Sequence, residues 1–430
     1  MNILYLNHYA GSPLHGMEYR PYYLAREWVH AGHCVRMLAG SHSHVRARQP
    51  DLPALQAAGA TRSGHATVQD IDGIAYHWYA TPPYAGNGLG RVRNIWAFLR
   101  QAWADAPRIA REFRHDVVIA SSTYPMDIWV ARRIARLTRR AGHPCTLVFE
   151  VHDLWPLSPI ELGGMSPGHP FIRLCQAAEN AAYRDADVVV SMLPKVAGHM
   201  QAHGLDLRRL HIVPNGITLD EWQGEPPPLR GDIARHVAAQ KAAGRTVVGY
   251  AGSHGTPNAL DVMLQAAALL RDAPFSFVLV GDGHEKAALR QQAEALGLAD
   301  TVAFFDPIPK AQIPAFLAQV DIAYIGWQRV PIYRFGIAPN KLMDYMMARC
   351  VVLHSVEAGN DPVAEAGCGL TVPPADPPAI AQGLRQLAAI DPATRARMGE
   401  SGRAHVLAHH TYPVLARRFL EACGASLAKS

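Results

Sequence analysis

The sequence predicts an α/β protein with two doubly wound, Rossmann-like domains, and three observations support this fold class. Short apolar runs of strand length alternate with helical patterns along most of the chain. Gly-containing loops follow several of these strands before a helix begins, which is typical of βαβ units with parallel strands. The opening order of strand, Gly-containing loop and helix returns at Thr246. We therefore expect two similar halves that face each other across a central cleft.

The length and composition are those of a globular protein with more than one core. The chain has 430 residues, of which 49% are hydrophobic and 18% are charged. No apolar run approaches the roughly 18 residues of a spanning helix, and residues 1–8 lack the basic start and cleavage site of a signal peptide. We therefore expect a cytoplasmic protein. The six cysteines form no CxxC pair, which argues against a disulfide framework and a thiolate zinc site.

The domain boundary is predicted from a Pro-rich link, Glu225–Leu229. We expect an N-terminal domain at residues 1–215, a linker at 216–231 and a C-terminal domain at 232–410. Residues 411–430 are expected to form a helix that crosses back to the first domain.

The first strand, Ile3–Leu6, ends in a Gly-containing loop, and a helix is expected at 21–31. Open α/β sheets bind ligands at the carboxyl ends of their strands. The alternative is a loop whose glycines only turn the chain. The residues of interest in this loop are Gly11, His15, Gly16 and Arg20.

Residues 41–69 carry little regular pattern. After them, Asp70 and Asp72 stand one residue apart and could hold a divalent cation. Asp72 is followed by Gly73 and by an alternating strand at 74–79, so an Asp-Gly hairpin turn explains the pair better. We therefore predict no metal site here.

Two helical stretches between Leu89 and His115, and a helix that Pro125 opens, are rich in arginine and tryptophan. With a net charge of +5 and a pI near 8.9, this surface suits contact with an anionic membrane. Ordinary solvated helix faces are the alternative, and nucleic-acid binding is disfavoured because no such motif accompanies the arginines. The helix that Pro125 opens carries Arg132, Arg133, Arg136, Arg139 and Arg140.

His152 and Asp153 stand at the carboxyl end of a predicted strand, Cys145–Val151. Adjacent residues on an extended backbone point apart, so the two do not form a dyad. His152 is therefore expected to contact substrate.

The most informative stretch of the second half is a predicted strand, Val320–Gly326, followed by a loop and by a helix that begins after Pro339. The N–H groups of a helix N-terminus behind such a loop favour an anion, and Lys341 adds a positive charge. Asp344 lies about one turn deeper, where it could accept bonds from sugar hydroxyls. The alternative is a lysine that merely lies along the surface at the start of a capped helix.

The sequence resembles the GT-B glycosyltransferases of family 4 over nearly its whole length. Within this family it resembles a bacterial subgroup called WbuB-like, which builds surface polysaccharides and O-antigen. The residues that carry the resemblance are Gly11–Arg20, Val151–Asp153, Val213–Gly216, Tyr250–Gly252, Val280–Gly283 and Phe335–Met346.

The resemblance implies a donor site in the second domain, a sugar and acceptor side in the first, and transfer that retains the anomeric configuration without a bound metal or other cofactor. The donor residues it implies are Gly252, Ser253, His254, Gly255, Asp282, Pro307, Ile308, Pro309, Phe335, Gly336, Ile337, Ala338, Pro339, Asn340, Lys341 and Asp344. The residues on the sugar and acceptor side are His15, Gly16, Glu18, Arg20, His152 and Asp153. Those expected to act in catalysis are His152, Lys341 and Arg20.

The sequence departs from the family at two points. Gly336 stands eight positions before Asp344, where many relatives have the first glutamate of a pair, so Asp344 alone is left for the ribose. The loop after Gly252 also lacks the usual Arg and Lys, so Lys341 must carry more of the phosphate charge.

The function predicted from this resemblance is transfer of a hexosyl or N-acetylaminosugar group from a nucleotide-diphospho-sugar, UDP-linked and of the N-acetylfucosamine type. The predicted acceptor is lipid-linked or a saccharide of lipopolysaccharide O-antigen or another surface polysaccharide, at the inner face of the cell membrane. Two alternatives stay open: a sugar-nucleotide epimerase of the same architecture, and a non-catalytic subunit that binds a nucleotide sugar. The loop residues themselves fit UDP and GDP alike.

Overall fold

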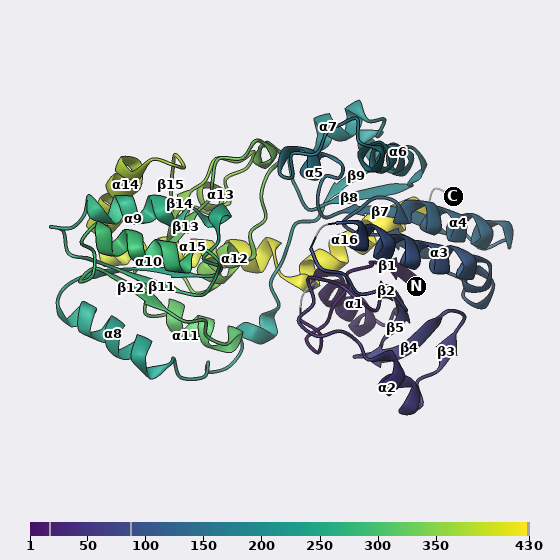
Figure 1. Ribbon diagram of the computed structural model, residues 1–430, viewed down its shortest axis with the longest axis horizontal. Helices are drawn as coiled ribbons and strands as arrows, with labels where there is room; N and C mark the ends of the chain where they lie inside the picture. The colour runs from purple at the N-terminus through teal and green to yellow at the C-terminus, as the bar shows by residue number, and fades with distance from the viewer. Residues whose placement is uncertain (17–18, 87, 428–430) are drawn as a thin grey trace. The chain divides into compact units, whose positions relative to one another are not determined.

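The computed structural model describes residues 1–16, 19–86 and 88–427, and the chain forms two compact units (Figure 1). The N-terminal unit consists of Met1–Asn215 with Tyr412–Ser430, and the C-terminal unit of Gly216–Thr411. Each unit is built on its own sheet of mainly parallel strands with helices packed on it, which confirms the predicted α/β fold class. Within the described residues, no helix combines the length and the apolar composition that crossing a bilayer requires.

The N-terminal unit has a nine-stranded sheet with the order β3-β4-β5-β2-β1-β6-β7-β8-β9. All described pairs are parallel except those of β4 with β3 and β5. The chain runs outward from β1 through β2 and returns to the other side of β1 with β6, so the loops after β1 and β6 flank a topological switch point. The strands are β1 (Asn2–Leu6), β2 (Cys34–Gly40), β3 (Arg62–Ser63), β4 (Ala66–Ile71), β5 (Ile74–Tyr79), β6 (Val117–Ala120), β7 (Thr146–Val151), β8 (Val188–Ser191) and β9 (Leu210–Ile212).

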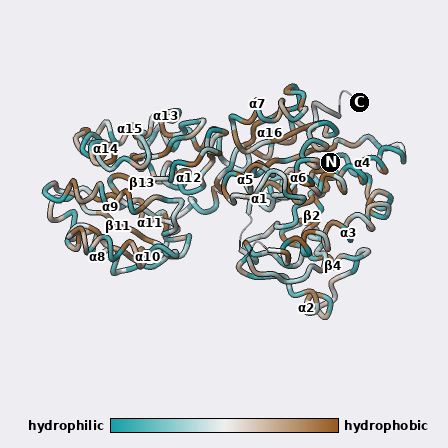
Figure 2. The backbone as a smooth tube through the Cα atoms, turned by 45° about the horizontal axis from the view of Figure 1, so that its top comes forward, coloured by the Kyte–Doolittle hydropathy of each residue, from teal (hydrophilic) through white to brown (hydrophobic). Residues whose placement is uncertain are grey.

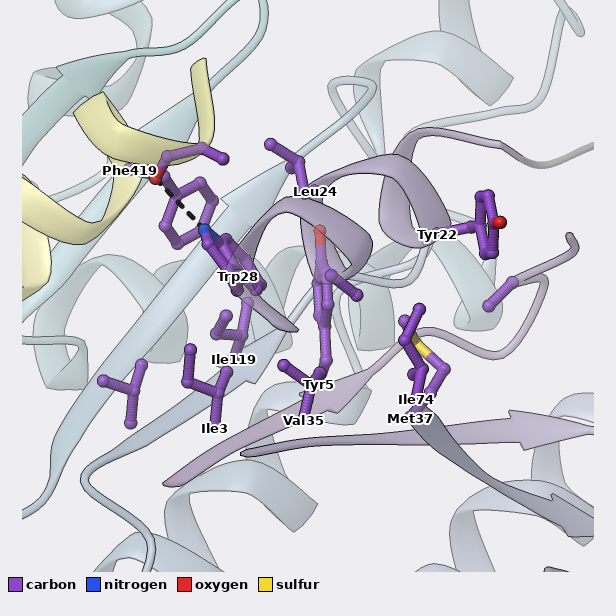
Figure 3. Packing of buried hydrophobic residues seen from close by; sticks show 14 of the residues in the cluster. Ile3, Tyr5, Tyr22, Leu24, Trp28, Val35, Met37, Ile74, Ile119 and Phe419 are labelled. Atoms are coloured by element: carbon purple, nitrogen blue, oxygen red, sulfur yellow. Dashed lines mark hydrogen bonds between the residues drawn. The ribbon is translucent and has the colours of Figure 1, made fainter. Parts of the chain in front are cut away.

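The C-terminal helix completes the core of this unit. On one face of β1, Tyr5 packs against Trp28 of α1, and Trp28 in turn packs against Phe419 of α16 with ring centroids 5.2 Å apart (Figure 3). The indole N–H of Trp28 donates to the carbonyl oxygen of Ala416 at 3.1 Å, which satisfies a buried polar group. The helices of this unit are α1 (Arg20–His30), α2 (Leu52–Ala57), α3 (Leu89–Glu112), α4 (Asp127–Arg140), α5 (Leu157–Glu161), α6 (Pro170–Asp185), α7 (Ala197–Ala202), η1 (Leu207–Arg209) and α16 (Tyr412–Leu427).

The C-terminal unit has a six-stranded parallel sheet with the order β12-β11-β10-β13-β14-β15, whose switch point lies between β10 and β13. The strands are β10 (Thr246–Ala251), β11 (Phe275–Val280), β12 (Val302–Phe305), β13 (Ile322–Gly326), β14 (Val351–Ser355) and β15 (Gly369–Val372). The helices are η2 (Leu219–Trp222), α8 (Gly231–Ala242), η3 (Thr256–Asn258), α9 (Leu260–Ala268), α10 (Lys286–Ala295), η4 (Lys310–Gln312), α11 (Ile313–Leu317), η5 (Pro331–Phe335), α12 (Asn340–Met347), α13 (Pro362–Ala366), α14 (Pro377–Ala389) and α15 (Pro392–His409).

Alternate residues of β10 enter two different cores of this unit. Val248 and Tyr250 join the cluster under α9 and α14, whereas Val247 and Ala251 join the cluster under α8 and α12. This is the period of two expected of a strand with both faces covered. Figure 2 shows the same arrangement in each unit, with apolar segments inside and polar segments along the outer loops and helices.

The predicted Asp-Gly hairpin is confirmed, but two neighbouring expectations are wrong. Ile71 pairs with Ile74 across a two-residue turn, in which Asp72 and Gly73 both have positive φ. Residues 41–69, expected to be irregular, contain α2, β3 and the start of β4. The signal for α2 was present, because the Asp51 side chain caps the helix by accepting from the N–H of Ala54. The two helical stretches expected after Leu89 are one helix, α3, which continues through Pro107.

Candidate active site

The switch point of the C-terminal unit brings Lys341 to the loop after β10. The ammonium of Lys341, in the first turn of α12, donates to the hydroxyl of Tyr250 at 2.9 Å and to the side-chain oxygen of Asn258 at 2.5 Å. Both of these partners are neutral oxygens, and burial lowers the pKa of Lys341 to about 8. The two partners of Lys341 do not neutralise its positive charge, so an anion that binds beside the ammonium is stabilised by it.

The loops after β10 and β11 pack backbone against backbone beside Lys341. A Cβ atom on Gly281 would lie 1.8 Å from the carbonyl oxygen of Gly252, so only glycine fits there. The two loops and the segment after β12 enclose a pocket of about 260 Å³. Its lining residues are Ala251, Gly252, Ser253, Val280, Gly281, Asp282, Pro307, Ile308 and Ile313. The structure thus brings together five of the residues predicted for the donor: Gly252, Ser253, Asp282, Pro307 and Ile308.

The other two residues predicted in this loop, His254 and Gly255, lie next to the pocket. The N–H of His254 donates to the carbonyl oxygen of Asp282 at 2.8 Å, which ties the loop after β10 to the loop after β11. Burial and the charge of Lys286 lower the pKa of His254 to about 4, so its ring is neutral at neutral pH. Gly255 immediately precedes η3.

Asp344 is paired with a lysine that the sequence did not single out. The ammonium of Lys310 lies 2.8 and 2.7 Å from the two carboxylate oxygens of Asp344, and 3.5 Å from Glu221. Although burial alone would lower the pKa of Lys310, these two acids raise it above its ordinary value. Lys310 directly follows the predicted Pro307–Pro309 segment, but nothing in local spacing connects it to a residue in α12, so only the fold could reveal the pair.

The loop that leads into α12 is held by an asparagine from the next strand-to-helix loop. Asn360 accepts from the N–H of Ile337 at 2.7 Å, and its amide donates to the carbonyl oxygen of Ile337 at 3.2 Å. Gly336 has a φ of 101°, a backbone conformation that favours glycine. This conformation gives a physical reason for the glycine at that position. Phe335 and Ile337 are buried beside it, and Ala338 and Pro339 complete the turn into Asn340.

In the N-terminal unit, His152 belongs to a buried network of polar side chains. Its Nε2 atom lies 2.9 Å from the hydroxyl of Ser121 and 3.2 Å from a carboxylate oxygen of Glu150. Glu150 is fully buried and also accepts from the hydroxyls of Ser121 and Tyr5. Despite burial, Arg20 and His152 hold the pKa of Glu150 well below its ordinary value.

Arg20 is committed to the same network. Its Nε atom donates to Glu150 at 3.0 Å, and its two terminal nitrogens donate to the carbonyl oxygens of Pro214 and Val213 at 2.6 and 2.8 Å. The residue is only 3% exposed. Arg20 therefore acts on His152 through Glu150, which the sequence pattern did not single out as a site residue.

Asp127, which sequence reasoning also missed, is the first residue of α4 and lies where the loop after β6 ends. One of its carboxylate oxygens accepts from the backbone N–H groups of Ser121 and Ser122 at 3.0 and 2.8 Å. Burial raises the pKa of Asp127 to about 7, against the pull of these N–H donors. The position at the start of a helix was its only sequence signal.

Three further residues predicted on the acceptor side belong to the segment between β1 and α1. The Nδ1 atom of His15 is hydrogen-bonded to the Ser12 hydroxyl at 2.9 Å, and burial lowers its pKa to about 4. Gly16 has a positive φ, and Glu18 lies outside the described residues.

Asp153 turns away from His152 into a separate groove. Its carboxylate accepts from the hydroxyl of Ser158 at 2.5 Å and from the N–H of Leu154 at 2.9 Å. The groove has a volume of about 700 Å³ and is lined mainly by apolar side chains, with Arg91 stacked 5.4 Å from the ring of Trp155.

The arginines of α4 are partly occupied within the unit. Arg132 pairs with Asp185, Arg139 pairs with Asp187, and Arg133 stacks over the ring of Trp103 at 4.5 Å. The surface is therefore less basic than the sequence suggests.

Two family matches cover most of the chain. Residues 15–216 match the "Glycosyl transferase 4-like domain" and residues 245–389 match "Glycosyl transferases group 1". The chain is 24% identical over 297 residues to WbjE of Pseudomonas aeruginosa, named as a glycosyltransferase, covering 68% of this chain and 71% of WbjE. It is 22% identical over 258 residues to WcaI of Escherichia coli, named for a glycosyl transferase of colanic acid biosynthesis, covering 58% of this chain and 61% of WcaI.

Among solved structures, Anabaena HepE in complex with UDP superimposes with a TM-score of 0.68 at 18% identity, covering 99% of this chain and all of HepE. This likeness shows the fold, which is that of the GT-B enzymes. Together, the two domain matches and the fold place the chain among the GT-B glycosyltransferases of family 4 type.

Proposed function

We propose that the protein is a retaining glycosyltransferase that moves a sugar from a UDP-linked donor to a lipid-linked or saccharide acceptor in the synthesis of a cell-surface polysaccharide or lipopolysaccharide O-antigen. The observation that carries the proposal is the half-buried ammonium of Lys341, which has two neutral oxygen partners at a switch point beside a small pocket. The name of WcaI supports the polysaccharide, and the UDP bound by HepE supports the donor base.

In the C-terminal unit, the diphosphate is proposed to bind between Lys341, the first N–H groups of α12 and the backbone of Gly252. The negative charge raises the pKa of Lys341 from about 8, so the ammonium stays protonated at neutral pH. When the bond from the sugar to the diphosphate breaks, the developing charge on the leaving oxygen is stabilised by groups that are already in place. This arrangement needs no metal ion, since the charge is met by one ammonium and by backbone dipoles.

The base is proposed to lie against Asp282 and the segment Pro307–Pro309, and the ribose to meet Asp344. Because Asp344 is paired with Lys310, ribose hydroxyls must share or replace that contact. Lys310 is 52% exposed at its side chain, so it can move aside into solvent.

In the N-terminal unit, His152 is proposed to contact the sugar and the acceptor, with Glu150 and Arg20 as positioning residues. Nε2 of His152 lies 2.9 Å from the hydroxyl of Ser121 and 3.2 Å from the carboxylate of Glu150, and these contacts fix the ring orientation. The mainly apolar groove beside Asp153 is proposed to take the acceptor, because its lining suits a lipid-linked saccharide. The surface of α3 and α4 is proposed to rest on the anionic inner face of the membrane.

The proposal is tested with the purified protein and a panel of UDP- and GDP-sugars. A donor at 100 times its dissociation constant should stabilise the folded state by about 2.7 kcal/mol, which a thermal-shift measurement detects. Release of UDP should then rise on addition of a lipid-linked or saccharide acceptor, and NMR of the product should show a retained anomeric centre.

Other outcomes would select a different function. Conversion of one UDP-sugar into its epimer without an acceptor would identify an epimerase. Binding without hydrolysis or transfer, in the presence of every acceptor tried, would point to a silent binding subunit. If no nucleotide sugar shifts the melting temperature, the donor site is wrongly assigned.

A further inference from the structure

Within the described part of the chain, one group of three metal-ligating side chains has its donor atoms within 4.8 Å of one another: Glu179, His199 and His203. Glu179 lies on α6, His199 lies on α7, and His203 directly follows α7. Glu179 is only 2% exposed and the two histidines are half-buried. None of the three belongs to the donor or acceptor residues described above.

The helical spacing presents both imidazoles to the same carboxylate. His199 and His203 are four residues apart, so their side chains lie on one face, and their ring centroids are 4.6 Å apart. The Nε2 atom of His199 is 3.2 Å from a carboxylate oxygen of Glu179. A small shift of these side chains would bring all three donors to coordination distance of one ion.

We propose that Glu179, His199 and His203 bind a Zn²⁺ ion. Two imidazoles and one carboxylate form a donor set that zinc takes in proteins, with a fourth position left for water or another ligand. The buried carboxylate supplies one negative charge, so the site holds a divalent cation without a second acid. Such an ion ties α6 to α7 at the edge of the sheet formed by β8 and β9.

Two neighbouring side chains already hold the carboxylate of Glu179 in one orientation. The hydroxyl of Tyr183 donates to one oxygen of Glu179 at 2.9 Å, and the amide of Gln176 donates to the other at 2.7 Å. The same amide nitrogen lies 2.8 Å from the side-chain oxygen of Asn180 and 3.1 Å from Nδ1 of His203, so its two N–H groups cannot serve all three acceptors at once. A bound ion takes the place of the contact between His199 and Glu179 and gives the imidazole of His203 a partner.

The alternative hypothesis is that these hydrogen bonds hold α6 and α7 together and that no metal binds. The two hypotheses predict different affinities for Zn²⁺. If the network is complete, added Zn²⁺ gains nothing from His199 and His203. If the site binds metal, affinity depends on both imidazoles and on the charge of Glu179.

The chain offers a matched control. His405 and His409 on α15 have the same spacing, and their ring centroids are 5.0 Å apart. Within the described residues, no third metal-ligating side chain forms a group with them. The experiment uses the full chain, stripped with a chelator and dialysed. Zn²⁺ binding is measured by calorimetry, and Co²⁺ is added as a probe whose visible absorption reports a tetrahedral site.

The expected result is one Zn²⁺ per chain at this site, a higher melting temperature and a tetrahedral Co²⁺ spectrum. The double variant His199→Ala, His203→Ala should lose all three, whereas His405→Ala, His409→Ala should keep them. Tyr183→Phe, which removes one bond to Glu179, should bind Zn²⁺ roughly tenfold more weakly.

Glu179→Gln keeps the shape of the side chain and covers the case in which the double histidine variant does not fold. It should bind neither Zn²⁺ nor Co²⁺ while it keeps the far-UV circular dichroism of the wild type. The proposal is overturned if the stripped wild type shows no saturable Zn²⁺ binding, or if Glu179→Gln binds the ion as tightly as the wild type does.

Discussion

Lys310 and Asp344 form an ion pair in which one ammonium meets both oxygens of the carboxylate, at 2.8 and 2.7 Å. Asp344 is 8% exposed, so removal of its partner leaves a buried negative charge. We expect Lys310→Met to lower the free energy of unfolding by about 1–2 kcal/mol, less than for a fully buried pair because solvent screens the half-exposed lysine. In a double-mutant cycle with Asp344→Asn, measured by urea denaturation, the two effects should not add. Additive losses would show that the pair contributes no coupling.

Replacement of Lys341 should weaken donor binding or catalysis and leave the fold intact. If its ammonium meets the diphosphate, Lys341→Ala should weaken donor binding or the transition state by roughly 1.5–3 kcal/mol. Steady-state kinetics and calorimetry with the donor measure this change. Lys241→Ala is the matched control, because Lys241 pairs with Asp321 and is not among the residues predicted for the donor. Near-native kinetics of a folded Lys341→Ala variant would remove Lys341 from the site.

The buried carboxyl of Asp127 should make stability depend on pH. Its pKa is raised from 3.8 to about 7 in the folded protein. Between these values the folded state binds a proton that the unfolded state has lost, so this group's contribution to stability falls as pH rises. Asp127→Asn keeps an oxygen for the N–H groups of Ser121 and Ser122 but does not titrate. In urea denaturation, its stability relative to wild type should rise by up to about 1.4 kcal/mol per pH unit from pH 4 to pH 7. A constant difference would show that Asp127 does not titrate in this range.

Membrane contact by α4 can be tested without disturbing its ion pairs. Arg132 and Arg139 are engaged with acids, so the variant reverses Arg133, Arg136 and Arg140 to Glu. Each basic residue near an anionic surface contributes about 1 kcal/mol, so co-sedimentation with vesicles containing anionic lipid should be lost. Reversal of Arg395, Arg397 and Arg403 on α15 is the control and should leave sedimentation unchanged. Equal binding by both variants would mean that the arginines of α4 are merely solvated.

Turnover should not require a metal. Asp70 accepts from the N–H of Gly73 within the hairpin, and Asp72 accepts from the hydroxyl of Tyr22 on α1, so both carboxylates have structural partners. The double variant Asp70→Asn, Asp72→Asn should keep most of its transfer rate, and wild-type turnover should persist in excess EDTA. Because the proposed zinc site affects stability, the assay is run well below the melting temperature of the stripped protein. Activity lost in EDTA and restored by Mg²⁺ or Mn²⁺ would show that catalysis uses a metal.

The architecture could be predicted from sequence because it rests on local patterns. The run that begins at Phe277 predicts a strand followed by the glycine loop at Gly281, and the structure has β11 at Phe275–Val280. The same logic located Lys341, since a helix N-terminus behind a loop is visible in the sequence. Lys310 and Glu150 could not be found in this way. Asp344 is 34 positions from Lys310, and Arg20 is 130 positions from Glu150. Only the folded chain brings these oppositely charged side chains together.

The return of α16 to the N-terminal unit means that this unit is discontinuous in sequence. A fragment that stops at Asn215 would expose the apolar face formed by Tyr5 and Trp28 and would leave the indole N–H without the carbonyl of Ala416. Such a fragment should aggregate, whereas Gly216–Thr411 carries its own two cores. If the donor binds in the C-terminal unit, as proposed, an exchange of that unit between related enzymes requires two junctions, one near residue 215 and one near residue 412. A chimera with a single crossover would combine a foreign last helix with a native hydrophobic surface that it was not selected to fit.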